Sequence, residues 1–211
     1  MQFENQKGLS ITMAVVSAVQ NNKNYLSEID GLIGDGDHGI NMNKGFTLFA
    51  ESIKGEELDF SASLKKLGRV LLGDIGGSMG PIYGQFFIEM SKVCKNSEYI
   101  NGMIFGNMLN AALSGIKELG SAKVGDKTLI DCLEPATIAF NKALSEGKDF
   151  ATCLNEMKSA AESGRDSTRD MIARIGRSSR LGERSRGVLD AGAASCCIIL
   201  CAMADSIKKL L

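Results

Sequence analysis

The apolar side chains of this sequence recur at the three- and four-residue spacing of α-helices. One such row runs through Phe60, Leu64, Leu67 and Leu71, and no stretch shows the two-residue alternation of a strand. The chain has two prolines among its 211 residues, which suits long helices because proline is excluded from helix interiors. We therefore expect an all-α protein.

Glycines and capping residues divide the chain into eight expected helices. Asn101 and Asp149 are expected N-caps, because each side chain can accept a hydrogen bond from a free amide of the first turn. No internal repeat and no linker is visible, so residues 1–211 are expected to form a single domain. The expected helices span residues 8–28, 40–54, 59–74, 81–94, 101–119, 127–146, 149–174 and 191–210.

Charge and composition exclude several classes of protein. The formal net charge is −1, whereas a general nucleic-acid-binding protein would carry a positive excess. The single histidine, His38, excludes zinc sites and phosphohistidine relays that need two histidines. The chain does not open with a signal peptide, has no run of eighteen apolar residues, and spaces none of its six cysteines as C-x-x-C. We therefore expect a cytoplasmic protein that binds neither nucleic acid nor a membrane.

The segment DGLIGDGDHG, from Asp30 to Gly39, places three aspartates within eight residues. Carboxylates this close repel one another unless a cation lies between them, and their oxygens suit Mg²⁺. We favour a metal site formed by Asp30, Asp35 and Asp37 over a solvated turn that merely caps a helix. The segment also matches G-x-G-x-x-G, but its aspartates would repel a dinucleotide's pyrophosphate. His38 suits a contact to metal-bound phosphate and a backbone hydrogen bond equally well.

Two further connections are rich in glycine. Gly77, Ser78 and Met79 come just before an expected helix, where free amides and the helix dipole attract anions; the alternative is a flexible turn without a ligand. The segment GSAKVGDKT, residues 120–128, is close to a P-loop, but an aspartate precedes its lysine and no strand precedes the loop. Lys127 is therefore equally well a phosphate contact or part of a helix start capped by Asp126.

Arginine is segregated along the chain. Seven of the eight arginines lie between residues 165 and 186, and only Arg69 lies elsewhere. The guanidinium group is a planar fork of donors that suits phosphate, so this window predicts a lid over a polyphosphate or a docking face for an acidic partner. RNA binding is disfavoured because the window contains no aromatic residue for base stacking. Together with the acidic and glycine-rich loops, the window indicates phosphoryl transfer by charge neutralisation.

These segments resemble the dihydroxyacetone kinase family, in particular its nucleotide-binding L subunit or domain. The matching text, between residues 33 and 195, is IGDGDHGINMNKGF, GGSMGPIYGQFF, VGDKTLIDCLEPA and GRSSRLGERSRGVLDAGAAS. The resemblance implies a barrel of eight antiparallel helices with the nucleotide at one end. It also implies that Asp30, Asp35 and Asp37 hold two Mg²⁺ ions that bridge the phosphates of ADP. The implied nucleotide contacts are His38, Gly39, Ile40, Asn41, Ser78, Met79, Gly120, Leu129, Arg177, Asp190, Ala191 and Gly192.

The family has a form in which the L part is a separate subunit that keeps ADP as a resident coenzyme. In that form a phosphohistidine-carrying M subunit of the phosphoenolpyruvate phosphotransferase system rephosphorylates the nucleotide. The phosphoryl group then passes to dihydroxyacetone held by a K subunit, giving dihydroxyacetone phosphate. This sequence has the L part alone, so the resemblance implies a phosphotransferase subunit with K and M partners. An ATP-using subunit for dihydroxyacetone or a carrier-presented acceptor, a non-catalytic nucleotide sensor and a homodimer are left open.

Overall fold

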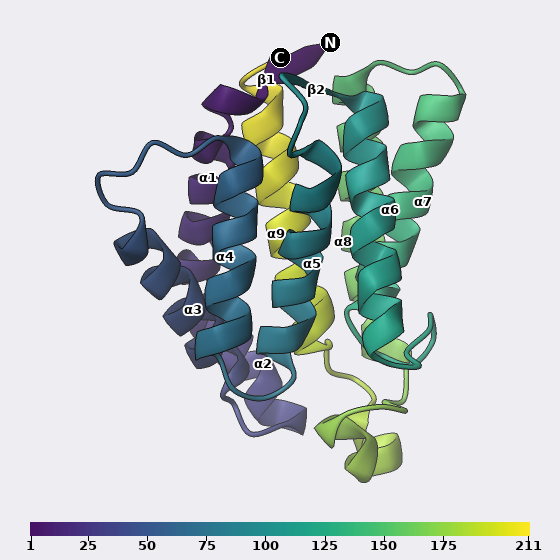
Figure 1. The fold of residues 1–211 in the computed structure, drawn as a ribbon. Coiled ribbons are helices and arrows are strands. Elements are labelled where there is room, and N and C mark those ends of the chain that lie inside the picture. Colours follow the sequence, from purple (N-terminus) through teal and green to yellow (C-terminus); the bar gives the residue numbers. More distant parts are fainter.

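In the computed structural model, which describes residues 1–211, nine α-helices make up most of the chain (Figure 1). The predicted all-α class is therefore confirmed. The helices are α1 Leu9–Asn21, α2 Lys23–Ile33, α3 His38–Ser52, α4 Phe60–Asp74, α5 Met79–Cys94, α6 Gly102–Leu119, α7 Ile130–Ser145, α8 Phe150–Ser167 and α9 Ala191–Lys208. Three short 3-10 helices are η1 Asn5–Lys7, η2 Thr168–Asp170 and η3 Arg177–Ser185.

Two three-residue strands, which the sequence did not predict, tie the chain near its start to the segment that precedes α6, at the same end of the molecule as the termini (Figure 1). Strand β1, Gln2–Glu4, pairs antiparallel with β2, Tyr99–Asn101, so that Phe3 lies opposite Ile100. Three residues are too few to display the alternation that marks a strand in a sequence.

The long helices follow one another round the molecule. Each of α3 to α8 packs on the next helix in the chain, α9 packs on α1, and α1 packs on α3. These neighbours close a ring that leaves out only α2, which lies across one end of it (Figure 1). This order of packing is the one expected for a closed barrel of eight helices. The barrel itself stays a prediction.

Two hydrophobic clusters hold the helices together. A core of 45 buried residues draws on every α-helix except α2. Helix α2 has its own small cluster, in which Leu26 and Ile29 pack on Ala191 and Ala194 at the start of α9. This contact brings the end of α2 and the beginning of α9 to the same place, although about 160 residues separate them in the chain.

The first expected helix, residues 8–28, is wrong in its extent. The chain breaks at Asn22, whose side-chain amide donates to the carbonyl of Ala18 at 2.8 Å and so closes the end of α1. Helix α2 then runs on to Ile33, which places Asp30 on a helix rather than in the loop. No glycine or proline marks this break in the sequence.

The expected helix over residues 149–174 is also too long. Helix α8 ends at Ser167, and the hydroxyl of Thr168 then donates to the carbonyl of Arg165 at 2.6 Å. The same hydroxyl accepts the backbone amide of Asp190 at 3.0 Å, which ties the chain down and turns it away from the helix axis.

The two expected N-caps are confirmed. The side chain of Asn101 accepts the amide of Ile104 at 3.0 Å at the start of α6. The side chain of Asp149 accepts the amide of Thr152 at 2.7 Å at the start of α8.

Helix α9 is long and apolar enough to cross a membrane, but 67% of this stretch is buried inside the fold. It runs through the middle of the view in Figure 1 and packs on α1, α7 and α8. We therefore regard α9 as a core helix of the fold.

The loops that the sequence analysis singled out gather at one end of the molecule, opposite the two termini (Figure 1). They are the loop between α2 and α3, the loop before α5, the loop before α7, and the long connection between α8 and α9. The candidate site lies among them.

Candidate functional site

A cavity of about 290 Å³ lies where these loops meet. Its walls come from five parts of the chain: the end of α2 with the loop that follows, the start of α5, the loop before α7, residues 175–178 and the start of α9. Most of the residues predicted for the site line this cavity. They are Asp30, Asp35, Asp37, His38, Ser78, Met79, Leu129, Arg177, Asp190, Ala191 and Gly192.

Four of the predicted residues do not line the cavity: Gly39, Ile40, Asn41 and Gly120. The side chain of Ile40 is 53% exposed, and the α-carbon of Gly120 faces open space. Gly39 has a packing role, because a Cβ there would overlap the backbone carbonyl of Lys23 on α2. Its missing side chain allows the start of α3 to lie directly against α2.

This close approach assembles a cluster of three carboxylates. The side chains of Asp30, Asp35 and Asp37 bring oxygen atoms within 4.8 Å of one another. Asp30 comes from the last turns of α2, Asp37 immediately precedes α3, and Gly36 turns the chain between them with a φ of +76°. Asp37 makes no capping hydrogen bond with its side chain, so the capping alternative has no support here. Three hard oxygen donors this close suit Mg²⁺ rather than zinc.

One arginine reaches the acidic cluster. Arg177 forms an ion pair with Asp35 and is the only arginine that lines the cavity. Others in the arginine-rich window bind protein groups: Arg165 pairs with Asp166 at 2.8 Å, and Arg186 donates to a carbonyl of η2 at 2.9 Å. Of the seven arginines expected to form a lid, only Arg177 therefore lines the cavity.

His38 lies at the cavity wall and contacts the hydroxyl of Ser195, which in turn contacts the hydroxyl of Tyr83. Its Nε2 lies 2.8 Å from the Oγ of Ser195, which lies 2.6 Å from the hydroxyl of Tyr83. The backbone amide of His38 also donates to Asp30 at 3.3 Å. Burial lowers the pKa of His38 to about 4, so the ring is neutral at pH 7. His38 thus suits hydrogen bonding rather than charge pairing.

Comparisons with known proteins identify the family of this chain. The chain matches the DAK2 domain over residues 32–205. It is 37% identical to the "PEP-dependent dihydroxyacetone kinase 1, ADP-binding subunit DhaL" of Listeria innocua. The 186 aligned residues cover 88% of each chain. It is 34% identical to the corresponding DhaL subunit of Escherichia coli K12, over 88% of this chain and 89% of that one.

The chain belongs to the DhaL family.

Solved structures show the same fold for this DhaL-family chain. The native dihydroxyacetone kinase of C. freundii superposes with a TM-score of 0.72 at 24% identity, over 97% of this chain and 35% of that one. The same kinase in complex with AMP-PNP and Mg²⁺ gives a TM-score of 0.72 at 23% identity, over 98% of this chain. The DhaL-family chain thus spans about a third of the length of that kinase.

Tyr83 lines the cavity of this DhaL-family chain, and Ser195 lies behind it in contact with His38, although the sequence analysis predicted neither. Both are buried within long helices, α5 and α9, and there they look like ordinary core residues. The helical spacing of the sequence could have predicted that Ser195 lies near the site. It lies four residues after Ala191, which was predicted to contact the nucleotide, and so it lies on the same face of α9.

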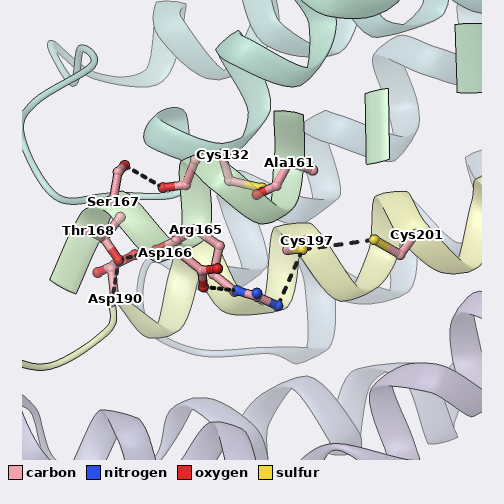
Figure 2. A network of polar contacts seen from close by, with 10 residues as sticks. Cys132, Ala161, Arg165, Asp166, Ser167, Thr168, Asp190, Cys197 and Cys201 are labelled. Carbon is pink, nitrogen blue, oxygen red and sulfur yellow. Dashed lines mark hydrogen bonds and ion pairs between the residues drawn. The ribbon is translucent and has the colours of Figure 1, made fainter. Parts of the chain in front are cut away.

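Asp190 caps the start of α9 and forms the far wall of the site. Its carboxylate accepts the amide of Ala193 at 2.7 Å, and burial raises its pKa to about 7. From Asp190, Figure 2 shows a chain of polar contacts through Thr168 and Arg165 to the thiol of Cys197. The wall of the cavity is thereby fastened to the body of α8 and α9.

Lys127 also lines the cavity, and its side chain binds the protein itself. Its ammonium group donates to the backbone carbonyls of Met171, Ser185 and Val188. The alternative of a helix start capped by Asp126 is wrong, because that carboxylate accepts the amide of Lys123 instead. The free amides before α7 are taken by Asp131, which accepts those of Gly125 at 2.5 Å and Thr128 at 2.7 Å.

Proposed function

We propose that this protein is the ADP-binding phosphotransferase subunit of a dihydroxyacetone kinase driven by the phosphoenolpyruvate phosphotransferase system. The observation that carries the proposal is the cluster of Asp30, Asp35 and Asp37 at a cavity that Arg177 also lines. Support comes from the relatives of matching length, which are named ADP-binding subunits of PEP-dependent kinases.

The three carboxylates would hold magnesium, with two ions as the resemblance implies. Bound magnesium neutralises the charge of phosphate oxygens, which phosphoryl transfer requires. The carboxylates are suited to this because helices on both sides fix them and Asp37 makes no competing capping bond. Their close spacing also costs electrostatic energy that a cation would remove.

Groups from the other walls would hold the nucleotide. Arg177 lies beside Asp35 and supplies a planar fork of donors for phosphate. The loop containing Ser78 leads into the N-terminus of α5, where free amides favour an anion. The neutral ring of His38 adds a hydrogen-bonding group held in place by Ser195.

The apolar part of the cavity would accept the base and exclude water. Met79 and Ile82 of α5, Leu129 before α7, and Ile175 contribute this lining. A base held between apolar side chains, with its phosphates among polar loops, follows the general pattern of nucleotide pockets.

The chain itself supplies positioning and charge, and no covalent phosphoryl carrier. Its only histidine is buried and hydrogen-bonded. We therefore propose that the phosphoryl group comes from a phosphohistidine-carrying M subunit and passes to dihydroxyacetone held by a K subunit. Both partners would approach the end of the molecule where the loops gather, within the cytoplasm.

Mass spectrometry of the purified protein under native conditions, before and after dialysis, tests the resident coenzyme. We expect bound ADP with magnesium to survive dialysis, and phosphoenolpyruvate to drive dihydroxyacetone phosphate formation once K and M subunits are added. Turnover driven by added ATP from an empty site would instead assign an ATP-using subunit. Nucleotide binding without turnover under either donor would assign a sensor.

Asp35→Asn tests the metal assignment. Loss of one carboxylate ligand should weaken binding of ADP in the presence of Mg²⁺ by about 100-fold or more in calorimetry. Asp74→Asn is the matched control, because Asp74 is an exposed carboxylate at the same end of the molecule with no side-chain partner. Normal Mg²⁺ and ADP binding by the Asp35 variant would make the metal assignment wrong.

A further inference from the structure

Lys127 is a lysine buried without a carboxylate partner. Its side chain is 1% exposed, whereas lysines are almost never fully buried unless their charge is satisfied. The ammonium donates to the backbone carbonyls of Ser185 and Val188 at 2.6 Å each, and to that of Met171 at 3.3 Å. An ammonium group has three hydrogens, so these carbonyls use its full donor capacity.

All three carbonyls belong to one stretch, the connecting segment of residues 168–190 between α8 and α9. Lys127 comes from a different wall, the loop before α7, so a single side chain joins two walls of the cavity. A backbone bond reinforces the junction, because the amide of Arg174 donates to the carbonyl of Asp126 at 3.1 Å.

Few apolar contacts anchor the connecting segment to the core. Ala173 and Leu189 are its only buried apolar residues, and neither belongs to a hydrophobic cluster. The segment is therefore held mainly by polar contacts, and segments of this kind open at the lowest cost in free energy.

The backbone of Lys127 is strained. Its φ of +61° makes it the only residue other than glycine in the left-handed region. Asp131 holds the loop on both sides of it, through the amides of Gly125 and Thr128. Such strain persists where the surrounding structure enforces it, and it is concentrated at functional sites. Glycine would take this conformation freely, so the side chain must be what the position requires.

We propose that Lys127 is a positioning residue whose ammonium fastens the connecting segment to the loop before α7 and thereby holds Arg177 and Asp190 at the cavity. The proposal rests on the proposed function only in that the cavity receives a nucleotide. Because the carbonyls take all three hydrogens, Lys127 acts on the nucleotide through the segment and not by direct contact. Burial lowers the pKa of Lys127, and the charge of Asp190 opposes that effect.

Two substitutions separate the side chain from the backbone conformation. Lys127→Gly keeps the left-handed backbone at no cost and removes the ammonium. Lys127→Met keeps an unbranched apolar stem and also removes the ammonium. Lys123→Met is the matched control, because Lys123 is an exposed lysine of the same loop and its ammonium binds no protein group.

Limited trypsin digestion of the full chain without nucleotide, read by mass spectrometry, measures how firmly the connecting segment is held. We expect cleavage after Arg177, Arg180, Arg184 and Arg186 to be about tenfold faster in both Lys127 variants, with cleavage elsewhere unchanged. ADP binding in Mg²⁺ should weaken by about tenfold in calorimetry, since the segment must then be ordered on binding. Added propylammonium should restore protection to Lys127→Gly, which a general loss of packing would not permit.

Unchanged protection of the segment in both Lys127 variants would overturn the proposal. Weaker ADP binding with full protection would also overturn it, because Lys127 would then contact the phosphates directly. If the unmodified protein fails to bind ADP, the proposed function fails, while the digestion without nucleotide still decides the positioning role.

Discussion

The two sides of the candidate site are built in different ways. The acidic loop, defined here as residues 30–37, consists of the last turn of α2 and the four residues before α3, two helices that pack closely because Gly39 has no side chain. The connecting segment, residues 168–190, is long and contributes no residue to either hydrophobic cluster. It is held by hydrogen bonds that Lys127 donates to its backbone carbonyls.

This difference suits the two tasks that we assign to them. A metal site needs ligands fixed within a few tenths of an ångström, and helix ends packed on each other provide that precision. A segment that covers a nucleotide must open and close, and a polar attachment with little buried apolar surface allows such motion. Substitutions that disturb packing should therefore affect the acidic side most, whereas loss of single hydrogen bonds should affect the connecting segment.

Gly39→Ala should have the largest effect on stability. The added methyl group would meet the carbonyl of Lys23 and the side chain of Ser27, which forces α3 away from α2 and costs about 2 to 4 kcal/mol of unfolding free energy. Urea denaturation measures the loss. Gly73→Ala is the control, because Gly73 lies in helix α4 with open space at its α-carbon, where alanine should stabilise slightly. Equal stability of the Gly39 variant and the unmodified protein would contradict the packing role.

Thr168→Val should have an intermediate effect, confined to the connecting segment. The change keeps the shape of a fully buried side chain but removes the hydroxyl that accepts the amide of Asp190 (Figure 2). The partly buried amide of Asp190 then loses its partner, at a cost of about 1 to 3 kcal/mol. Urea denaturation gives the size of the loss, and trypsin digestion should show faster cleavage after Arg177. Thr137→Val on α7 is the control, because this threonine is also buried and its hydroxyl donates only to the helix carbonyl of Leu133. A similar loss there would show that the effect is not specific.

Arg177→Lys should have the smallest effect on stability and a clear one on binding. The Arg177–Asp35 pair is exposed, so its loss should change the unfolding free energy by less than about 1 kcal/mol. ADP binding in Mg²⁺ should weaken by about tenfold in calorimetry, because lysine cannot hold phosphate with a planar fork. Arg184→Lys serves as the control, since Arg184 does not line the cavity. Unchanged affinity for ADP in the Arg177 variant would show that Arg177 does not connect the acidic loop to the connecting segment through the nucleotide.

Most helices could be predicted because apolar spacing and capping residues are local features of the sequence. The ends of two helices could not be predicted. The break at Asn22 and the early end of α8 at Ser167 depend on side-chain contacts that no glycine or proline marks. Predictions that rest on periodicity cannot detect such contacts.

The acidic side of the site could be predicted because its three aspartates lie within one short segment. The opposite side could be predicted only in part. Seven arginines in one window indicated phosphate binding, yet only the fold decides that Arg177 faces the cavity and that Arg165 and Arg186 bind the protein. The partners of Lys127 are backbone carbonyls, which every residue has, so the sequence cannot indicate them.

In the proposed complex the acidic loop binds metal, and the phosphates of a nucleotide join it to the connecting segment. Calorimetric titration of the nucleotide-free protein with ADP, in Mg²⁺ and then with the metal chelated, tests this directly. ADP should bind tightly in Mg²⁺ and lose about 100-fold or more in affinity without it. Equal affinity for ADP in both conditions would show that the acidic loop does not hold the metal that binds the phosphates.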